Sequence, residues 1–205
     1  PSIEITGSRE IYGTNPLRKE GFAIPADISF AVRGGDILQH GGTYSGASSV
    51  AARIVSLAYL WNVIRVQGGA YGTGIHINRD GLVSCYSYRD PNAAGSLEAY
   101  TRCGAFLKEF CSKAEDLTGF IVGAISDASP VMTARMKGGA ADTNIFTNNS
   151  EERRRRIWTE ILNTTVTAVA DTADALDLAM QDGGICVVGS MNQLQSCGLD
   201  VIESV

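Results

Sequence analysis

The sequence predicts an α+β domain in which helices pack on one face of a mostly antiparallel sheet. Three observations lead to this class: an early stretch of alternating apolar residues, two strands flanking a polar turn, and several helical periodicities before a short last strand. Helices that come in a run favour this class over a parallel sheet, whose strands and helices alternate. We expect residues 21–205 to form this single domain, after an irregular approach segment at 1–20 with a short strand at 3–5.

The strands are predicted from period-two patterns and turn signals. From Phe22 to Val32, apolar side chains occupy every second position, as in a strand with one buried face, and Gly34-Gly35 should end it. A hairpin is predicted over Gly74 to Tyr88, because the central Asn78-Arg79-Asp80-Gly81 ends in the Asp-Gly pair that favours tight turns. The last strand is expected at Ile185 to Val188.

Helices are predicted where apolar residues recur three and four positions apart. Ser45 is a suitable cap for a helix that continues through Trp61 and places Arg65 at or just past its end. No period is visible over 129–149, which we expect to be a loop with a short helix at 131–137. Further helices are expected over Leu97–Cys111, over Leu117–Ile125, from Ser150 with Ile157, Trp158, Ile161 and Leu162 buried, and over Val166–Met180 before Gly183-Gly184.

Composition indicates a folded globular protein. Hydrophobic residues make up 44% and charged residues 19% of the 205 positions, and a chain of this length buries roughly 70% of its unfolded surface. No apolar run approaches the roughly 18 residues of a membrane span, so no membrane partner is predicted. A net charge of −5 argues against a nucleic-acid partner, because the phosphates would meet a surface of like sign.

The cysteines and the first residue bear on the protein's setting. Five cysteines, odd in number and without a Cys-x-x-Cys pair, indicate neither a disulfide framework nor a zinc site, and favour a reducing compartment. The chain starts at Pro1 without an initiator Met or an apolar signal, from which we expect a piece of a longer polypeptide.

Several common sites do not fit the sequence. A P-loop needs Lys and then Ser or Thr after its last glycine, which follow neither Gly72 nor Gly74. A dinucleotide loop leads from a strand into a helix, whereas these glycines lead from a helix into a strand. The two histidines, His40 and His76, lie far apart in the sequence, and His-x-x-Glu-His is absent in either direction. We therefore predict no metal site and no complete catalytic set in this chain.

Arg65 and Tyr71 stand on either side of a glycine-rich turn. A tight turn at Gly68-Gly69 would bring their side chains to one point, because one residue leaves a helix and the other enters a strand. Guanidinium and phenol are both hydrogen-bond donors, which suits an oxygen that gains negative charge, such as the oxyanion of amide hydrolysis. Spacing alone also allows an ordinary turn with an exposed Arg and a packed Tyr.

Three longer strings carry a resemblance to a known family. The stretches "YLWNVIRVQGGAYGTG", "SYRDPN" and "EERRRRIWTEILNTT" begin at Tyr59, Ser87 and Glu151. In this order they resemble the presequence-protease branch of the pitrilysin/insulinase zinc metallopeptidases, in particular the last of its four domains. The resemblance covers Gly21 to Val188 and implies a chamber, closed by two halves, that admits unfolded peptides.

The resemblance also implies roles for individual residues. Arg65 and Tyr71 match the Arg and Tyr that hold the scissile carbonyl oxygen, and Gly68, Gly69 and Gly72 would let the substrate approach. Zinc would be bound by an N-terminal domain of the parent enzyme, whose zinc motif this chain lacks. The chain alone should therefore be inactive, with the zinc-bearing domains and a peptide substrate as its partners.

Two alternatives to a peptidase domain stay open. The chain could instead be a non-catalytic scaffold, or a peptide-binding subunit, of the same fold family. A peptidase of this kind is expected in the cytoplasm or an organelle matrix. An isolated half-chamber exposes an apolar patch, from which we expect a homodimer of the isolated fragment.

Overall fold

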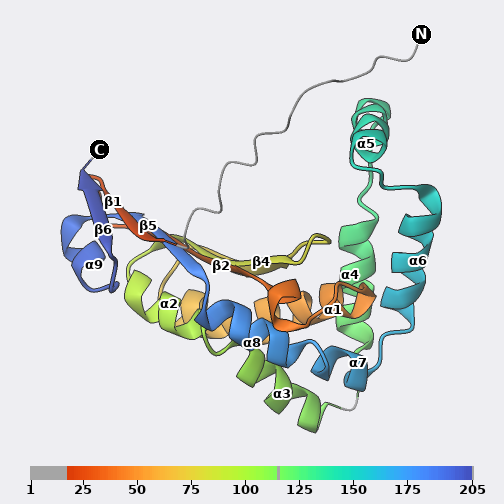
Figure 1. The fold of residues 1–205 in the computed structure, drawn as a ribbon, viewed down its shortest axis with the longest axis horizontal. Coiled ribbons are helices and arrows are strands. Elements are labelled where there is room, and N and C mark those ends of the chain that lie inside the picture. The colour runs from red at the N-terminus through yellow and green to blue at the C-terminus, as the bar shows by residue number, and fades with distance from the viewer. Residues whose placement is uncertain (1–17, 115, 205) are drawn as a thin grey trace.

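The computed structural model describes residues 18–114 and 116–204, and its six strands form one sheet in the order β3-β4-β2-β5-β1-β6 (Figure 1). Pairs β3·β4, β4·β2 and β2·β5 are antiparallel, whereas β1 runs parallel to β5 and β6. This confirms the predicted α+β class, and the strand expected at 3–5 lies outside the described residues. The strands are β1 (Lys19–Ala23), β2 (Ser29–Asp36), β3 (Gly72–Ile77), β4 (Leu82–Asp90), β5 (Gly184–Gly189) and β6 (Val201–Ser204).

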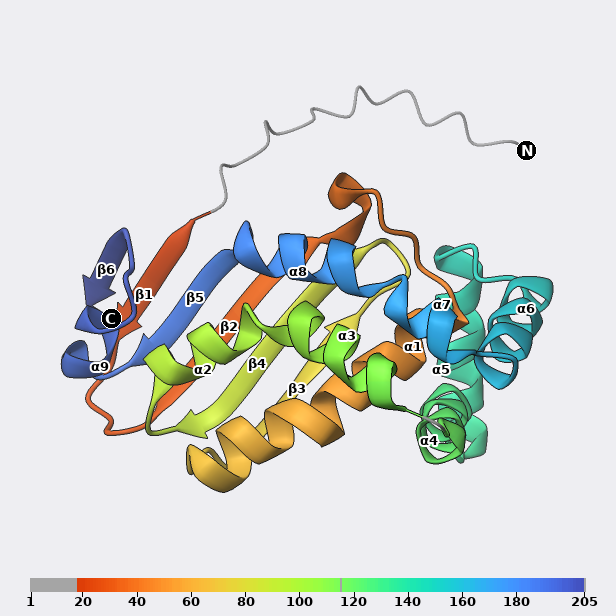
Figure 2. The same ribbon diagram turned by 90° about the horizontal axis from the view of Figure 1, so that it is seen from below.

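Helices cover one face of the sheet, and the other face carries none in the part of the chain described (Figures 1 and 2). Side chains of β4 alternate accordingly, since Val83, Cys85 and Ser87 are buried while Leu82 and Tyr88 are exposed. The helical segments are η1 (Ile37–His40), α1 (Gly46–Ile54), η2 (Val55–Gln67), α2 (Ala93–Tyr100), α3 (Cys103–Lys113), α4 (Thr118–Ala128), α5 (Ala134–Phe146), α6 (Glu151–Leu162), α7 (Val166–Ala170), α8 (Ala173–Gln181) and α9 (Met191–Gln195).

The single strand predicted from Phe22 to Val32 is in fact two strands, β1 and β2. Between them, the Ala26 N–H donates to the Ile24 carbonyl (2.9 Å) in a turn around Pro25, which cannot itself donate to a sheet. Strand β5 inserts between β1 and β2, so apolar alternation continues across a break in pairing. Strand β2 also continues through Gly34-Gly35 to Asp36, and Gly35 allows the close approach of the α8 backbone at Ala179.

The helix predicted from Ser45 is present and longer than expected. The Ser45 N–H donates to Ser48 Oγ (3.1 Å) at its start, and α1 passes directly into η2, which has π-helical geometry. Arg65 lies in the last turn of η2.

Helix Gly46–Gln67 bears on the prediction that no apolar run approaches the roughly 18 residues of a membrane span. By length and composition alone it is long and apolar enough to cross a membrane. Its buried residues include Val50, Ile54, Leu60 and Ile64, all part of the core beneath the sheet. The apolar side of this helix is therefore in use inside the domain.

Two helices predicted as continuous are each divided in two. The segment Leu97–Cys111 belongs to α2 and α3, and Val166–Met180 to α7 and α8. At both breaks a threonine hydroxyl donates to the carbonyl three residues earlier: Thr101 to Glu98 (2.7 Å) and Thr172 to Val169 (2.7 Å). Such side chain-to-backbone bonds compete with the helical pattern.

Helix α5 corrects the loop predicted over 129–149. The helix begins after Thr133, whose hydroxyl accepts from the Met136 N–H (3.4 Å), and it has no buried residue. It projects from the body of the domain (Figure 1), so its sequence has no reason to carry an apolar face.

Helix α6 begins as predicted but buries fewer residues. Ser150 Oγ accepts from the Arg153 N–H (3.2 Å) at the helix start. Ile161 is buried and Ile157 partly buried, whereas Trp158 and Leu162 are 41% and 59% exposed. Helix α6 packs on the outside of α1 and α4, so only a narrow stripe of its side chains faces inward.

All five cysteines are free thiols in the structure. Cys85 and Cys103 lie together in the core with their sulfur atoms 3.8 Å apart. Burial raises the pKa of the Cys85 thiol well above its usual value. These two side chains therefore serve the core as small apolar groups.

Gly104 and Gly139 provide a matched test of helix packing. A side chain at Gly104 would collide with the backbone of α8, 2.8 Å from Asp177 N, whereas one at Gly139 in α5 meets nothing within 4 Å. Urea unfolding should show Gly104→Ala destabilised by about 1–3 kcal/mol. Gly139→Ala should be stabilised by about 0.5–1 kcal/mol, because alanine favours an exposed helix. Equal effects of the two substitutions would contradict the α3–α8 packing.

Candidate functional site

The candidate site is the corner where η2 ends, β3 begins and β4 ends. The Tyr71 N–H is shared between the carbonyls of Tyr88 (3.0 Å) and Arg89 (3.3 Å), which joins the start of β3 to the end of β4. Arg65 Nη1 donates to the Ala70 carbonyl (3.0 Å). The two residues predicted to meet at the glycine turn are thus held at one corner by the backbone around it.

A row of aromatic rings extends from this corner over the end of the sheet. Arg65 Cζ lies 5.5 Å from the Tyr71 ring centre and 5.6 Å from that of Trp61. Tyr71 meets Tyr88 edge to face at 5.8 Å, and Tyr88 meets Phe30 in the same way at 5.3 Å. We call Phe30, Tyr88 and Tyr71 the aromatic row. Tyr71 is 63% exposed, so the row is open to a ligand.

Both predicted donors lie at this corner, in an arrangement that differs from the expected one. The Arg65 guanidinium lies against the Tyr71 ring rather than at its hydroxyl. No described carboxylate lies within 4.0 Å of Arg65, and its buried Nε has no hydrogen-bond partner among the described residues.

The glycines of the turn serve different purposes. Gly69 has φ +80°, a left-handed conformation that favours glycine, and the Ala70 N–H then donates to the Ile64 carbonyl (3.1 Å). A side chain at Gly68 would come within 2.7 Å of that same carbonyl. At Gly72 the nearest atom to an added Cβ is 4.0 Å away, at Tyr88. Folding thus explains Gly68 and Gly69, while Gly72 leaves room beside the aromatic row.

Tyr88 and Arg89 were not among the predicted site residues. Both belong to the "SYRDPN" string, whose place at the end of a strand was the available signal. The next residue, Asp90, is fully buried and accepts from the Ser96 hydroxyl (2.5 Å) and the Asn92 N–H (2.8 Å). These bonds hold the end of β4 against α2.

The residues described do not fit a zinc site. No group of three His, Cys, Asp or Glu side chains is placed to hold a metal within 18–114 and 116–204. His40 Nε2 lies 3.7 Å from Asp182 Oδ2, while His76 on β3 stacks on Tyr86 at 5.3 Å. The histidines are thus engaged in separate elements.

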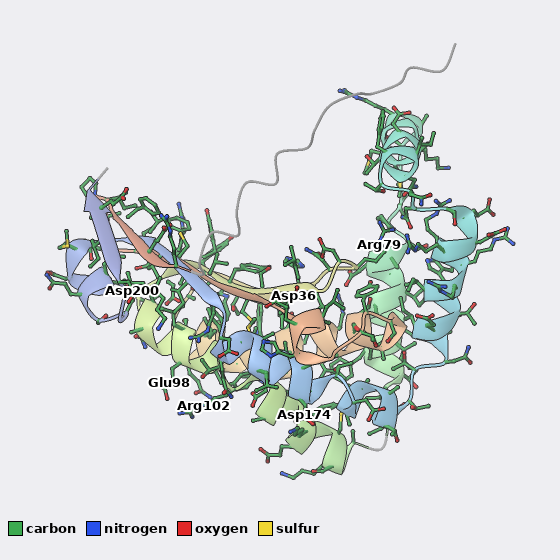
Figure 3. The ribbon with its side chains drawn as sticks, viewed as in Figure 1. Asp36, Arg79, Glu98, Arg102, Asp174 and Asp200 are labelled. Carbon is green, nitrogen blue, oxygen red and sulfur yellow. The ribbon has the colours of Figure 1, made fainter. Side chains whose placement is uncertain are left out.

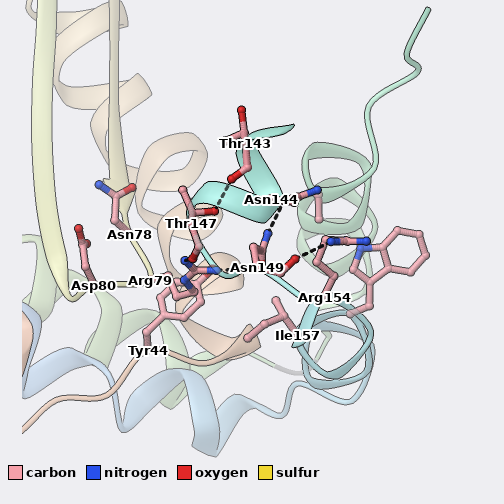
Figure 4. Close-up of a pocket in the computed structure, with 12 residues that line it drawn as sticks. Tyr44, Asn78, Arg79, Asp80, Thr143, Asn144, Thr147, Asn149, Arg154 and Ile157 are labelled. Atoms are coloured by element: carbon pink, nitrogen blue, oxygen red, sulfur yellow. Dashed lines mark hydrogen bonds between the residues drawn. The ribbon is translucent and has the colours of Figure 1, made fainter. Parts of the chain in front are cut away.

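A separate hollow of about 430 Å³ lies at the other end of the β3–β4 hairpin (Figure 4). Arg79, in the hairpin turn, donates to Asn149 Oδ1 (2.8 Å) and the Thr147 carbonyl (3.1 Å). Arg154 donates to the Asn149 carbonyl (2.6 Å). Because the polar groups of this hollow bond to one another, we assign them to holding the α5–α6 connection against the hairpin.

Comparison with known proteins identifies the family. A family described as "PreP C-terminal domain" matches residues 19–191. The chain belongs to this family. It is 32% identical over 178 residues to Protein HypA of Clostridium perfringens, and 31% identical over 185 residues to presequence protease 1, chloroplastic/mitochondrial, of Arabidopsis thaliana. These matches cover 87% and 90% of this chain but 18% and 17% of the two relatives, so the chain spans less than a fifth of their length.

Solved structures share the fold of this presequence-protease domain. Pitrilysin superposes with a TM-score of 0.58 at 14% identity, over 85% of this chain and 20% of pitrilysin. A protease from Helicobacter pylori gives 0.57 at 11% identity, over 85% of this chain and 45% of that protein. The sheet and its helical layer therefore have the architecture of this peptidase group.

Substitution at two glycines tests the turn. Gly69→Ala should lower the free energy of unfolding by about 1–2 kcal/mol, because alanine strains the left-handed conformation. Gly72→Ala should change it by no more than about 0.5 kcal/mol, since an added Cβ finds room there. Urea unfolding monitored by tryptophan fluorescence measures both. A Gly69→Ala domain as stable as the original would rule out the left-handed turn.

Proposed function

We propose that this chain is the C-terminal domain of an intracellular zinc metalloendopeptidase that degrades unfolded peptides. In this proposal it closes the substrate chamber and supplies Arg65 and Tyr71 to the scissile carbonyl, while zinc is held by an N-terminal domain. The observation that carries the proposal is the placing of Arg65 Cζ 5.5 Å from the exposed Tyr71 ring, within a presequence-protease C-terminal domain.

The two side chains have complementary tasks in amide hydrolysis. The carbonyl oxygen of the cleaved bond gains negative charge as the tetrahedral intermediate forms, and donors placed in advance stabilise that charge most. The Tyr71 hydroxyl donates a hydrogen bond without transferring its proton, while the Arg65 guanidinium contributes a full positive charge. The open space at Gly72 lets the peptide backbone approach the aromatic row.

The remainder of the proposal concerns partners and location. The length of the relatives supports zinc-bearing domains on the same polypeptide or on a partner subunit. Relatives are named as chloroplastic/mitochondrial and mitochondrial presequence proteases, and one is a bacterial protein. A cytoplasmic or organelle-matrix location suits the five free thiols.

Kinetics of the full-length polypeptide, loaded with zinc, test the role of the two donors. Tyr71→Phe and Arg65→Ala should each lower kcat by about 10²- to 10³-fold, because each removes one oxyanion donor. Tyr44→Phe, in the hollow at the other end of the hairpin, and Arg102→Ala are matched controls away from the corner and should leave kcat unchanged. Zinc content and folding must equal those of the unsubstituted enzyme. Unchanged turnover in the Tyr71 and Arg65 variants would favour the scaffold interpretation instead.

We also propose that the isolated chain forms a homodimer through apolar surface that other domains cover in the parent. Ile145 and Phe146, at the end of projecting helix α5, are 75% and 88% exposed. Light scattering over a wide concentration range should show a dimer, and the double substitution Ile145→Ser with Phe146→Ser should weaken it. A monomer at every concentration would contradict the proposal.

A further inference from the structure

Arg89 occupies a β-bulge next to the candidate site. Ser29 pairs with Asp90, and Ala31 with Ser87, so Tyr88 and Arg89 together lie opposite one residue of β2. Bulges beside active sites redirect side chains. The φ angle of Arg89 is +49°, in the left-handed region that is uncommon for residues other than glycine. Its side chain is therefore turned away from the position that regular pairing would give it.

The strained conformation of Arg89 is held from both sides. On one side, the Arg89 carbonyl accepts from the Tyr71 N–H (3.3 Å). On the other, Asp90 is anchored by the Ser96 hydroxyl (2.5 Å) and the Asn92 N–H (2.8 Å). A residue kept in a rarely populated conformation by its surroundings is a recognised sign of function. Here the strain is coupled through one hydrogen bond to Tyr71, a proposed oxyanion donor.

The Arg89 guanidinium lies against Tyr88, the ring next to Tyr71 in the aromatic row. Its Cζ lies 5.8 Å from the Tyr88 ring centre, and Tyr88 lies 5.8 Å from Tyr71. Each ring of this tyrosine pair thus has a guanidinium beside it, Arg65 at Tyr71 and Arg89 at Tyr88. Arg89 is exposed and, among the residues described, takes part in no ion pair, in contrast to Arg102, which pairs with Glu98.

We propose that Arg89 is a specificity-determining residue that binds a carboxylate of the peptide substrate beside the cleaved bond, an inference that rests on the proposed function. A planar guanidinium matches a carboxylate through two parallel hydrogen bonds, and ring stacking holds that plane in place. The path from Arg65 through the Tyr71 and Tyr88 rings to Arg89 is no longer than about five extended residues. The carboxylate therefore belongs to a nearby acidic side chain or to the peptide's C-terminus.

The test compares kcat/KM for matched peptides in the full-length, zinc-loaded polypeptide. One pair differs by Glu against Gln within five residues of the cleaved bond, and a second pair by a free against an amidated C-terminus. The unsubstituted enzyme should prefer the carboxylate in at least one pair. Arg89→Gly should reduce that preference by about tenfold or more, as expected for a lost hydrogen bond to a charged group. Glycine suits the positive φ, so folding should be retained.

Two further variants make the result specific. Arg89→Lys should keep part of the preference, because it retains the charge without the planar fork. Arg102→Gln removes an exposed arginine on the helical side of the domain (Figure 3) and should leave the ratio unchanged. Loss of preference in the Glu/Gln pair assigns the site to acidic side chains, and loss in the second pair to the C-terminus.

The outcomes separate this inference from the proposed function. Tyr71→Phe should lower kcat/KM for both members of a pair alike and preserve their ratio. An unaltered carboxylate preference in Arg89→Gly, or an equal fall for both members of each pair, would overturn the role of Arg89. A changed ratio in Arg89→Gly, alongside full activity of Tyr71→Phe, would keep the carboxylate site and reject the oxyanion donors.

Discussion

The joining of η2 to β3 over Gly68, Gly69 and Ala70 is the constraint on which the candidate site depends. The left-handed Gly69 reverses the chain within three residues, so the last helical turn and the first strand residue stay adjacent. The Ala70 carbonyl then accepts a hydrogen bond from Arg65 Nη1, and the following N–H, that of Tyr71, donates to both carbonyls of the β4 bulge. A single turn therefore sets the positions of Arg65, Tyr71 and Arg89 relative to one another.

Sequence patterns predict those helices and strands that have one solvent-exposed side and one buried side. The β3–β4 hairpin, the start of α6 and the helix after Ser45 all combine such a pattern with a local turn or cap, and all are present. Patterns fail where no contrast exists, as in α5, which has no buried residue. They also fail where the alternation of buried and exposed residues continues from one strand into the next, as from β1 to β2. Periodicity reflects burial and does not show which strands pair.

The candidate site divides in a similar way. Arg65 and Tyr71 could be singled out because a glycine turn makes residues close in sequence close in space. Tyr88 and Arg89 join them through strand pairing, which depends on the β3–β4 register and on a one-residue bulge. A lone string such as "SYRDPN" does not reveal which turn it will face. The different reasons for Gly68, Gly69 and Gly72 also required the surrounding atoms.

The position of β5 has a consequence for how the domain is made. Lys19 in β1 lies opposite Ile185 in β5, and β5 also pairs with β2 on its other side. Strand β1 thus enters the sheet only through a strand that is synthesised near the end of the chain. During synthesis on a ribosome, the backbone N–H and C=O groups of β1 stay unpaired until almost the whole domain has emerged. Contacts this distant in sequence slow folding and leave the nascent chain dependent on protection from aggregation.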